Sequence, residues 1–218
     1  MKITILCSHS GHPVVLHLKA WQALFVTKGH MVKLIYDQDE LPGGDILFLV
    51  SCGKLIRKTE REKYLVALVL HASDLPLGRG WSPHVWTILN GNNEITVCLL
   101  EADDPVDSGP VWLRKIISLE GHELLYEINE ILFQAELDLM SQAVEKFDRI
   151  SPQPQVGDPG LYMRKRTPLD SRLDPEKTIA EQFNLLRVVD FQRFPAYMDY
   201  RGKRYIFKIE KVDNNESE

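Results

Sequence analysis

The first hundred or so residues of the chain alternate short apolar runs with segments of helical pattern. The runs read KITILCS from residue 2, MVKLIYD from 31, DILFLV from 45 and YLVALVL from 64. Runs that are apolar on both faces are typical of central strands in a parallel sheet. Strands that alternate with helices predict an α/β fold, here a Rossmann-like, mostly parallel twisted sheet with right-handed crossovers.

The helical segments carry their own signals. Pro13 can begin a helix at no cost, and Gly29 is expected to end it. A second, longer helix is predicted over residues 120–148, and residues 94–102 read as a further strand. Each helix has one apolar face, formed by Val14, Leu18, Trp21 and Phe25 in the first and by Leu125, Ile128, Leu132, Ala135 and Leu139 in the second.

The stretch SPQPQVGDPG at 151–160 breaks this regularity with three prolines and two glycines. After it, residues 174–189 predict a helix with Asp174 as N-cap and Pro175 at its first position. Residues 194–212 alternate around an Arg-Gly turn and predict a β-hairpin. We therefore expect a catalytic domain at 1–150, a C-terminal extension of linker, helix and hairpin at 151–212, and a flexible tail at 213–218.

Net charge and composition narrow the classes of function that a chain of this sequence can have. The formal charge of −5 counts against a protein that grips a nucleic-acid backbone. Three cysteines lie far apart with no Cys-x-x-Cys pair, so reduced buried thiols are expected rather than a zinc or redox site. The N-terminus lacks the apolar core of a signal peptide, and no run has membrane-spanning length. The sequence predicts a cytoplasmic protein with no membrane partner and no metal.

His71 lies at the predicted C-terminal end of a buried strand, before the backbone-permissive loop SDLPLGRGWSP. Ligands of parallel α/β sheets bind beyond such strand ends. A second loop, LEADDPVDSGP, holds Asp103, Asp104 and Asp107. A carboxylate beside an imidazole fixes its tautomer, as in acyl-transfer sites, so a His71–Asp107 pair is one interpretation. A structural histidine and a merely solvated acidic loop are the others.

The stretch from His71 to Trp112 resembles the signature region of the formyltetrahydrofolate-dependent formyltransferases. Their pattern is Asn-x-His-x-Ser-x-Leu-Pro, a glycine-containing loop and, after a further strand, Asp-Ser/Thr-Gly. This chain has HASDLP at 71–76 and DSG at 107–109, in that order and each after a predicted strand. The resemblance covers about residues 45–112 and implies the formyltransferase fold.

The resemblance implies that N10-formyltetrahydrofolate is the donor and that no metal is required. An unprotonated amine attacks the formyl carbon, His71 relays the amine proton, and Asp107 orients His71 and stabilises its positive form. The implied folate pocket is formed by Leu75, Pro76, Gly78, Gly80, Trp81, Asp103 and Val106.

The sequence departs from the family pattern at one position. The family's asparagine, which donates to the formyl oxygen, falls at Val69, and valine has no donor. Losing such a donor typically costs roughly 10²–10³ in rate. Another donor could replace it, for example a side chain among Asn90, Asn92 and Asn93 or a backbone amide; otherwise His71 acts alone, or the protein is inactive.

The C-terminal segment resembles the same region of sugar N-formyltransferases, through an Arg-x-Thr-Pro-x-Asp element from Arg166 to Asp170 and Asn-Leu-Leu-Arg at 184–187. It implies a nucleotide-linked 4-amino sugar as acceptor, UDP- or dTDP-linked, such as a precursor of pseudaminic-acid-like sugars. Arg164, Arg166 and Tyr162 are the expected substrate contacts. The alternative for the arginines is surface salt bridges, and for Trp81 and Trp86 it is packing.

Three other functions stay open. A methionyl-tRNA-type formyltransferase shares parts of the C-terminal element, although the acidic charge and the absence of a basic domain after residue 218 count against it. Val69 would suit a non-catalytic folate- or nucleotide-binding module. Metal-dependent hydrolysis would need His71, Asp103 and Asp104 as ligands. The edge strands of the predicted hairpin could also pair across a homodimer.

Overall fold

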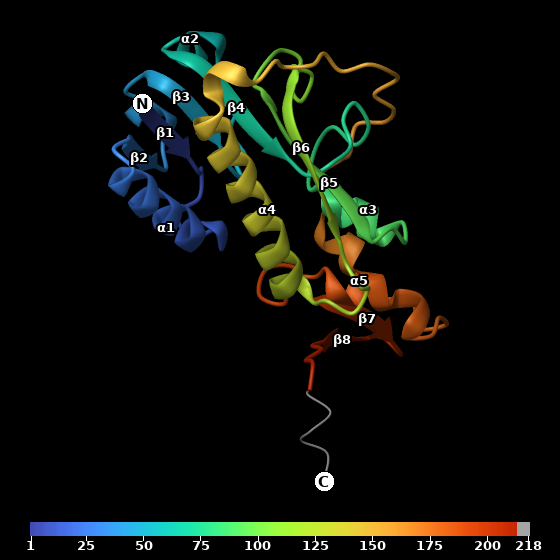
Figure 1. Cartoon of the computed structure of the whole chain (residues 1–218). Coiled ribbons are helices and arrows are strands. Elements are labelled where there is room, and N and C mark those ends of the chain that lie inside the picture. The colour runs from blue at the N-terminus through green and yellow to red at the C-terminus, as the bar shows by residue number, and fades with distance from the viewer. Residues whose placement is uncertain (213–218) are drawn as a thin grey trace.

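The computed structural model describes residues 1–212 and contains a six-stranded sheet (Figure 1). Its strands are β1 (Lys2–Leu6), β2 (Met31–Ile35), β3 (Gly44–Leu49), β4 (Tyr64–His71), β5 (Glu94–Glu101) and β6 (Val111–Ser118). They are arranged in the order β2-β1-β3-β4-β5-β6. The first four are parallel, whereas β5 is antiparallel to β4, and β6 to β5. This confirms the predicted mostly parallel α/β sheet.

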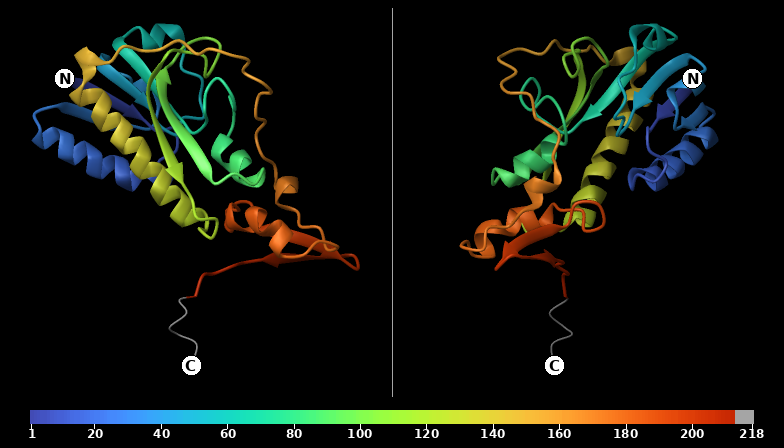
Figure 2. Two further views of the ribbon diagram at one scale, coloured as in Figure 1. Left: turned by 45° about the vertical axis from the view of Figure 1, so that its right-hand side comes forward. Right: turned by 180° about the vertical axis from the view of Figure 1, so that it is seen from behind.

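Two long helices, α1 (Val14–Thr27) and α4 (Leu125–Glu145), contact each other on one face of the sheet (Figures 1 and 2). Alternate residues of the strands face them; on β4 these are Leu68 and Leu70. The other face buries Leu47, Leu49 and Ala67 under the connections that contain η1 (Gln38–Glu40) and α2 (Lys58–Arg61). The period-2 alternation of a strand thus decides which residues are left for a site.

The main core contains one acid, Glu136 on α4, which is 7% exposed. Its Oε2 atom is buried without a hydrogen-bond partner in the described chain. Burial raises the pKa of this carboxyl from its ordinary 4.5 to about 8. Because the folded pKa is the higher one, the stabilising contribution is complete below about pH 4.5 and is lost as the pH rises toward 8.

We therefore expect Glu136→Gln to raise the free energy of unfolding at pH 8 by on the order of 3 kcal/mol, since the amide needs no proton uptake on folding. Urea unfolding at pH 6, 7 and 8 measures this, and the wild type should weaken over that range while the variant does not. Glu130→Gln, an exposed change on the same helix, is the control. An unchanged pH slope in Glu136→Gln would contradict the prediction.

The C-terminal unit corrects one expectation. The helix predicted from Asp174 forms only as a 3-10 turn, η4 (Ala180–Gln182), and a short α5 (Phe183–Arg187). The Asp174 carboxylate accepts the amide of Glu176, and the Gln182 side chain bonds both the amide and the carbonyl of Asp174. These side-chain bonds satisfy the backbone in a turn, which removes the need for helix there.

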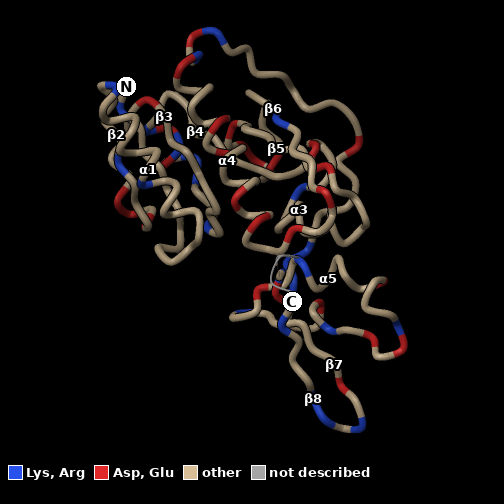
Figure 3. The backbone as a smooth tube through the Cα atoms, turned by 60° about the horizontal axis from the view of Figure 1, so that its bottom comes forward, with Lys and Arg blue, Asp and Glu red and all other residues tan. Residues whose placement is uncertain are grey.

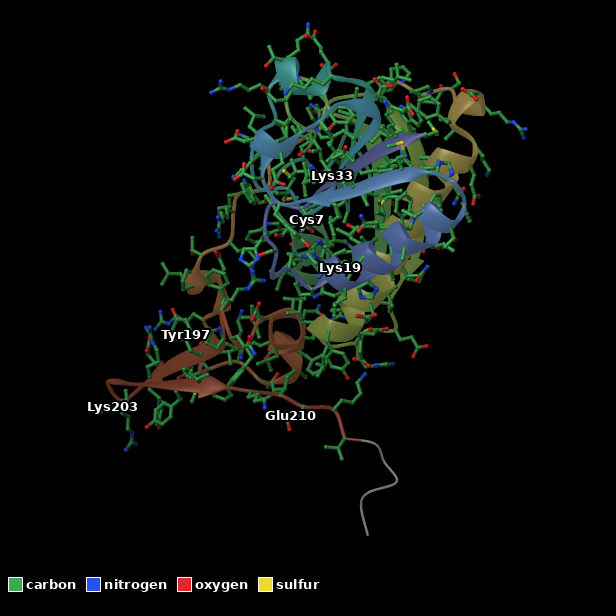
Figure 4. The ribbon with its side chains drawn as sticks, turned by 90° about the vertical axis from the view of Figure 1, so that its left-hand side faces the viewer. Cys7, Lys19, Lys33, Tyr197, Lys203 and Glu210 are labelled. Carbon is green, nitrogen blue, oxygen red and sulfur yellow. The ribbon has the colours of Figure 1, made fainter. Side chains whose placement is uncertain are left out.

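The predicted hairpin is present as β7 (Ala196–Tyr200) and β8 (Lys203–Phe207). Arg201 and Gly202 form its turn with φ of 47° and 74°, the positive values that such turns require. The hairpin lies below the sheet, and Lys203 marks its tip away from the α/β body (Figure 4). The outer edge of β7 is covered by a bridge to Arg172. Pairing across a homodimer stays a prediction.

Arg187 ties this unit to the sheet. It is 1% exposed, and its Nη2 donates to Asn93 Oδ1 at 2.6 Å while Nε donates to Asn184 Oδ1 at 2.9 Å. Its Nη1 lies 3.5 Å from Glu123 Oε2. The Glu123 carboxylate also accepts the amides of Glu120 and Gly121, so the buried charge is held from both sides.

Candidate active site

His71 is the last residue of β4 and is 7% exposed. Because Leu68 and Leu70 face α1 and α4, His71 and Val69 point to the opposite face. There Val69 packs beside a small cluster formed by Leu75, Cys98, Leu100 and Val111. Valine at 69 therefore contributes packing to the floor of the site and no hydrogen-bond donor.

The glycine loop (residues 72–82) closes over His71. The Nε2 atom of His71 lies 3.0 Å from the carbonyl oxygen of Gly78. Gly78 has φ of 74°, and a Cβ there would come within 2.8 Å of the Ser73 side chain. Gly80 has φ of 115°, and a Cβ there would meet the Met163 carbonyl oxygen at 2.4 Å. Glycine is required at both positions for the backbone to approach this closely.

The acidic loop (residues 102–110) brings Asp107 to His71 from an unexpected direction. Since β5 is antiparallel to β4, it passes His71 at Cys98 and ends three residues further on, with Glu101 beside Leu68. The loop then turns back and places Asp107 with a left-handed φ of 61°. Asp107 Oδ1 lies 3.6 Å from His71 Nδ1, and Oδ2 accepts the amide of Gly80 at 3.0 Å.

Both ring nitrogens of His71 therefore face oxygen atoms, those of Gly78 and Asp107. Asp107 faces the Nδ1 side of the ring and Gly78 faces the Nε2 side, so both hold the orientation of the imidazole. With both side chains 7% exposed, water screens the charges little. The pair can thus hold a proton taken from a reacting group.

A third segment, which we name the strap (residues 151–163), covers the two loops (Figure 2). It is extended chain that is hydrogen-bonded to the sheet domain. Gln153 exchanges backbone bonds with Val111, at 2.8 and 2.9 Å. The amide of Trp81 donates to the Met163 carbonyl, and the Met163 amide donates to Arg79. The strap is therefore part of the site's wall.

Basic groups gather beside His71. Burial, with the nearby charges of His71, Arg166 and His12, lowers the pKa of His84 to about 4, so its ring is neutral at physiological pH. Burial also lowers the pKa of Arg166. Arg166 donates from Nη2 to the Asp170 carbonyl, while Nε has no hydrogen-bond partner within residues 1–212. A partly buried guanidinium with a free donor at Nε is suited to an anionic ligand.

The other predicted substrate contacts lie next to this group. Arg164 pairs with Asp170 and lies over the Trp86 ring, 5.0 Å from its centroid. Tyr162 is exposed, and burial followed by the charge of Asp107 raises its pKa. Trp81 is 38% exposed and carries Lys165 over its ring. The exposed Trp81 offers a stacking surface.

The remaining residues predicted to contact folate differ in their exposure. Leu75 is 2% exposed, so it packs inside, whereas Pro76 is half-buried and Val106 is exposed. Asp103 is exposed and lines a separate hollow with Lys58, Arg61 and Tyr64. The structure therefore gathers His71, Asp107, Gly78 and Gly80 in direct contact and leaves Asp103 apart from them.

The asparagines weighed as replacements for the missing donor lie elsewhere. Asn93 is bonded to Arg187. It is five residues before Cys98, the partner of His71 on β5, which puts it about 17 Å away along the strand. Asn90 caps the far end of α3 (Pro83–Leu89). Within residues 1–212 no group of three His, Cys, Asp or Glu side chains is placed to hold a metal ion.

Sequence reasoning missed three functional-site residues, which are His84, Gln155 and Met163. His84 follows a proline at a helix start, and Gln155 lies in a segment that resembled a linker. No local pattern marks either residue. The three partners of Gln155 lie 46 to 76 residues away in the chain, and two of the charges near His84 belong to the distant residues Arg166 and His12.

Comparisons with known proteins agree with this geometry. Residues 2–144 match the model of the formyl transferase family. A methionyl-tRNA formyltransferase of Rickettsia typhi is 29% identical over 132 residues, which is 60% of this chain. The match spans 43% of that relative, so the chain covers less than half the length of the curated relatives it matches. Among the described residues no helix is long and apolar enough to cross a membrane.

Three solved structures share the fold. The methionyl-tRNA formyltransferase from Clostridium thermocellum has a TM-score of 0.82 at 21% identity, over 99% of this chain and 95% of that one. HypX from Aquifex aeolicus in complex with tetrahydrofolic acid has a TM-score of 0.77 at 21% identity, over 94% and 36%. A 4-N formyltransferase from Francisella tularensis has a TM-score of 0.72 at 16% identity, over 97% and 98%.

The structural likeness shows the fold, and the sequence match over residues 2–144 spans most of the sheet domain, His71 and Asp107 included. The predicted family is thereby confirmed, and the chain belongs to the formyl transferase family.

Proposed function

We propose that the protein transfers the formyl group of N10-formyltetrahydrofolate to the amine of a nucleotide-linked 4-amino sugar. The observation that carries the formyl transfer is the buried His71–Asp107 pair, held under the glycine loop in the motif order of the family. HypX, which shares the fold, has been crystallised with tetrahydrofolic acid, which supports the folate donor.

The proposed reaction begins when the amine nitrogen attacks the formyl carbon and forms the new C–N bond. The tetrahedral intermediate then collapses, and the bond from carbon to N10 breaks while N10 takes up the proton that His71 has received from the amine. His71 accepts the proton that the amine loses. For this, Nε2 exchanges the Gly78 carbonyl for the incoming amine, while Asp107 keeps its place at Nδ1 and stabilises the positive ring.

Charge favours a small anionic acceptor over a tRNA. Lysine and arginine are interspersed with aspartate and glutamate along the backbone (Figure 3), and the formal net charge is −5. The ring of His84 lies near the charges of both His71 and Arg166, Arg166 keeps a free donor at Nε within residues 1–212, and Arg164 is two residues away in the chain. Such a cluster is suited to the diphosphate of a nucleotide sugar.

A methionyl-tRNA acceptor is the second candidate. The TM-score of 0.82 to the Clostridium thermocellum enzyme, over 95% of that chain, favours it. A non-catalytic folate- or nucleotide-binding module is the third, because Val69 leaves no amide donor at the formyl oxygen.

A transfer assay tests these candidates against each other. Purified protein is mixed with N10-formyltetrahydrofolate and a panel of UDP- and dTDP-linked 4-amino sugars. We expect a mass gain of one formyl group in one sugar, with an equal amount of tetrahydrofolate released. The 4-acetamido form of the same sugar, which has no free amine, is the matched control.

Formylation of charged initiator tRNA and of no sugar would replace the sugar by tRNA as acceptor. Folate binding without any transfer would leave only the binding module. Either outcome would overturn the proposed function.

A further inference from the structure

The amide of Gln155 in the strap contacts both loops of the candidate site. Its Nε2 donates to the carbonyl of Asp107 at 2.8 Å and to the carbonyl of Gly109 at 2.9 Å. Its Oε1 accepts from Arg79 Nη2 at 2.7 Å. Both amide hydrogens and the amide oxygen are therefore used, which leaves the side chain one orientation.

These partners belong to the two segments that position the reacting groups. Asp107 and Gly109 lie in the acidic loop, and Arg79 lies in the glycine loop between Gly78 and Gly80. The loops also meet directly where Asp107 Oδ2 accepts the Gly80 amide. Gln155 also bonds to both loops, through Arg79 in the glycine loop and through two carbonyls of the acidic loop. The side chains of Gln155 and Asp107 therefore join the same two loops.

Asp107 needs such support. It has a left-handed φ of 61°, a conformation that costs energy for a residue with a side chain, even for aspartate. The bond from Gln155 to its carbonyl fixes the peptide plane that follows, and the bond at Gly109 fixes the end of the turn. A small rotation of this turn would change the 3.6 Å separation between Asp107 Oδ1 and His71 Nδ1.

We propose that Gln155 is a positioning residue for the His71–Asp107 pair: its amide holds the acidic loop and the glycine loop in the register that places Asp107 against His71. The inference rests on the proposed formyl transfer for its kinetic test, and it has a second test that needs no activity. Gln155 acts through Asp107 and touches neither reactant.

The variant is Gln155→Met, which keeps the length of the side chain and removes its hydrogen bonds. Misplacement of a catalytic group commonly costs about 10²-fold, and we expect kcat to fall by about that factor with little change in the acceptor KM. Gln153→Met is the matched control, because Gln153 is exposed in the same strap and its side chain bonds only the Ser151 carbonyl. Its kcat should stay within about twofold of the wild type.

A double-mutant cycle separates positioning from general damage. In an Asp107→Asn background the added Gln155→Met change should lower kcat by less than about threefold, because the group it positions is already disabled. Additive losses would mean that Gln155 acts by another route and would overturn the proposal. Gln155→Glu keeps an acceptor for Arg79 and loses both donations, so it should behave like Gln155→Met; wild-type activity in it would also overturn the proposal.

Hydrogen–deuterium exchange provides the test that is independent of formyl transfer. Peptides that cover residues 75–81 and 102–110 should exchange faster in Gln155→Met and at the wild-type rate in Gln153→Met. Unchanged exchange in both loops would overturn the proposal even if the enzyme were active. Absence of transfer in the wild type, by contrast, would overturn the proposed function and leave this measurement valid.

Discussion

Replacing His71 by asparagine is expected to lower kcat/KM for formyl transfer by about 10³-fold or more. General base catalysis contributes about 10²–10⁴-fold. In the proposed reaction His71 has two roles, since it takes the amine proton and then carries a positive charge beside the intermediate. Asparagine can still donate to Gly78 or Asp107, so it keeps part of the local hydrogen bonding and leaves the loops in place.

Single-turnover kinetics with the accepted sugar measure this loss, and tetrahydrofolate binding to the same variant shows whether the pocket survives. We expect the dissociation constant for tetrahydrofolate to change by less than about threefold. His122→Asn, a change at an exposed histidine outside the candidate site, is the matched control and should leave kcat/KM unchanged. Activity of His71→Asn within about tenfold of the wild type would exclude His71 as the proton acceptor.

Replacing Arg187 by methionine is expected to produce the largest loss of stability in the chain. Removing one partner of a buried ion pair costs about 3–5 kcal/mol, because the other charge is left without compensation. Here Glu123 loses its ion-pair partner and Asn93 loses a hydrogen-bond donor in one substitution. For a chain of this size the midpoint of thermal unfolding should fall by about 10 °C or more.

The double variant Glu123→Gln with Arg187→Met should recover part of that loss, since no buried charge remains. Glutamine can still accept the amides of Glu120 and Gly121 through its side-chain oxygen, one at a time. Arg204→Met, which removes an exposed arginine paired with Asp199 on the hairpin, is the control and should shift the midpoint by about 2 °C or less. A double variant as unstable as Arg187→Met alone would show that the charge is not the cause.

The sheet was predictable from sequence because a buried strand needs apolar residues on both faces, and KITIL, DILFL and YLVALVL supply them. The helix at residues 174–179 was wrong, because the Asp174 and Gln182 side chains satisfy the backbone of a turn that propensity alone cannot foresee. The spacing of apolar residues predicts which face of a helix is buried. It does not predict a hydrogen bond between side chain and backbone made across eight residues.

The candidate site divides in the same way. His71 and Asp107 lie in short motifs that resemble those of the formyltransferases. The sequence alone therefore predicted both as candidate site residues. The path by which the acidic loop brings Asp107 to His71 was not predictable. It depends on β5 being antiparallel to β4, which only the pairing of the two strands shows. Gln155 was missed altogether, because its three partners are 46 to 76 residues away in the chain.

The crossing of Gly80 by Met163 has a consequence for the order in which the protein matures. A ribosome exposes the sheet and both loops well before it exposes the strap, so the early chain can collapse around β1–β6 with its loops unrestrained. The contact joins residues more than eighty positions apart, and closing it is worthwhile only after the sheet exists. We therefore expect this contact to form after the sheet, so that a nascent chain ending before residue 151 would lack this wall of the candidate site.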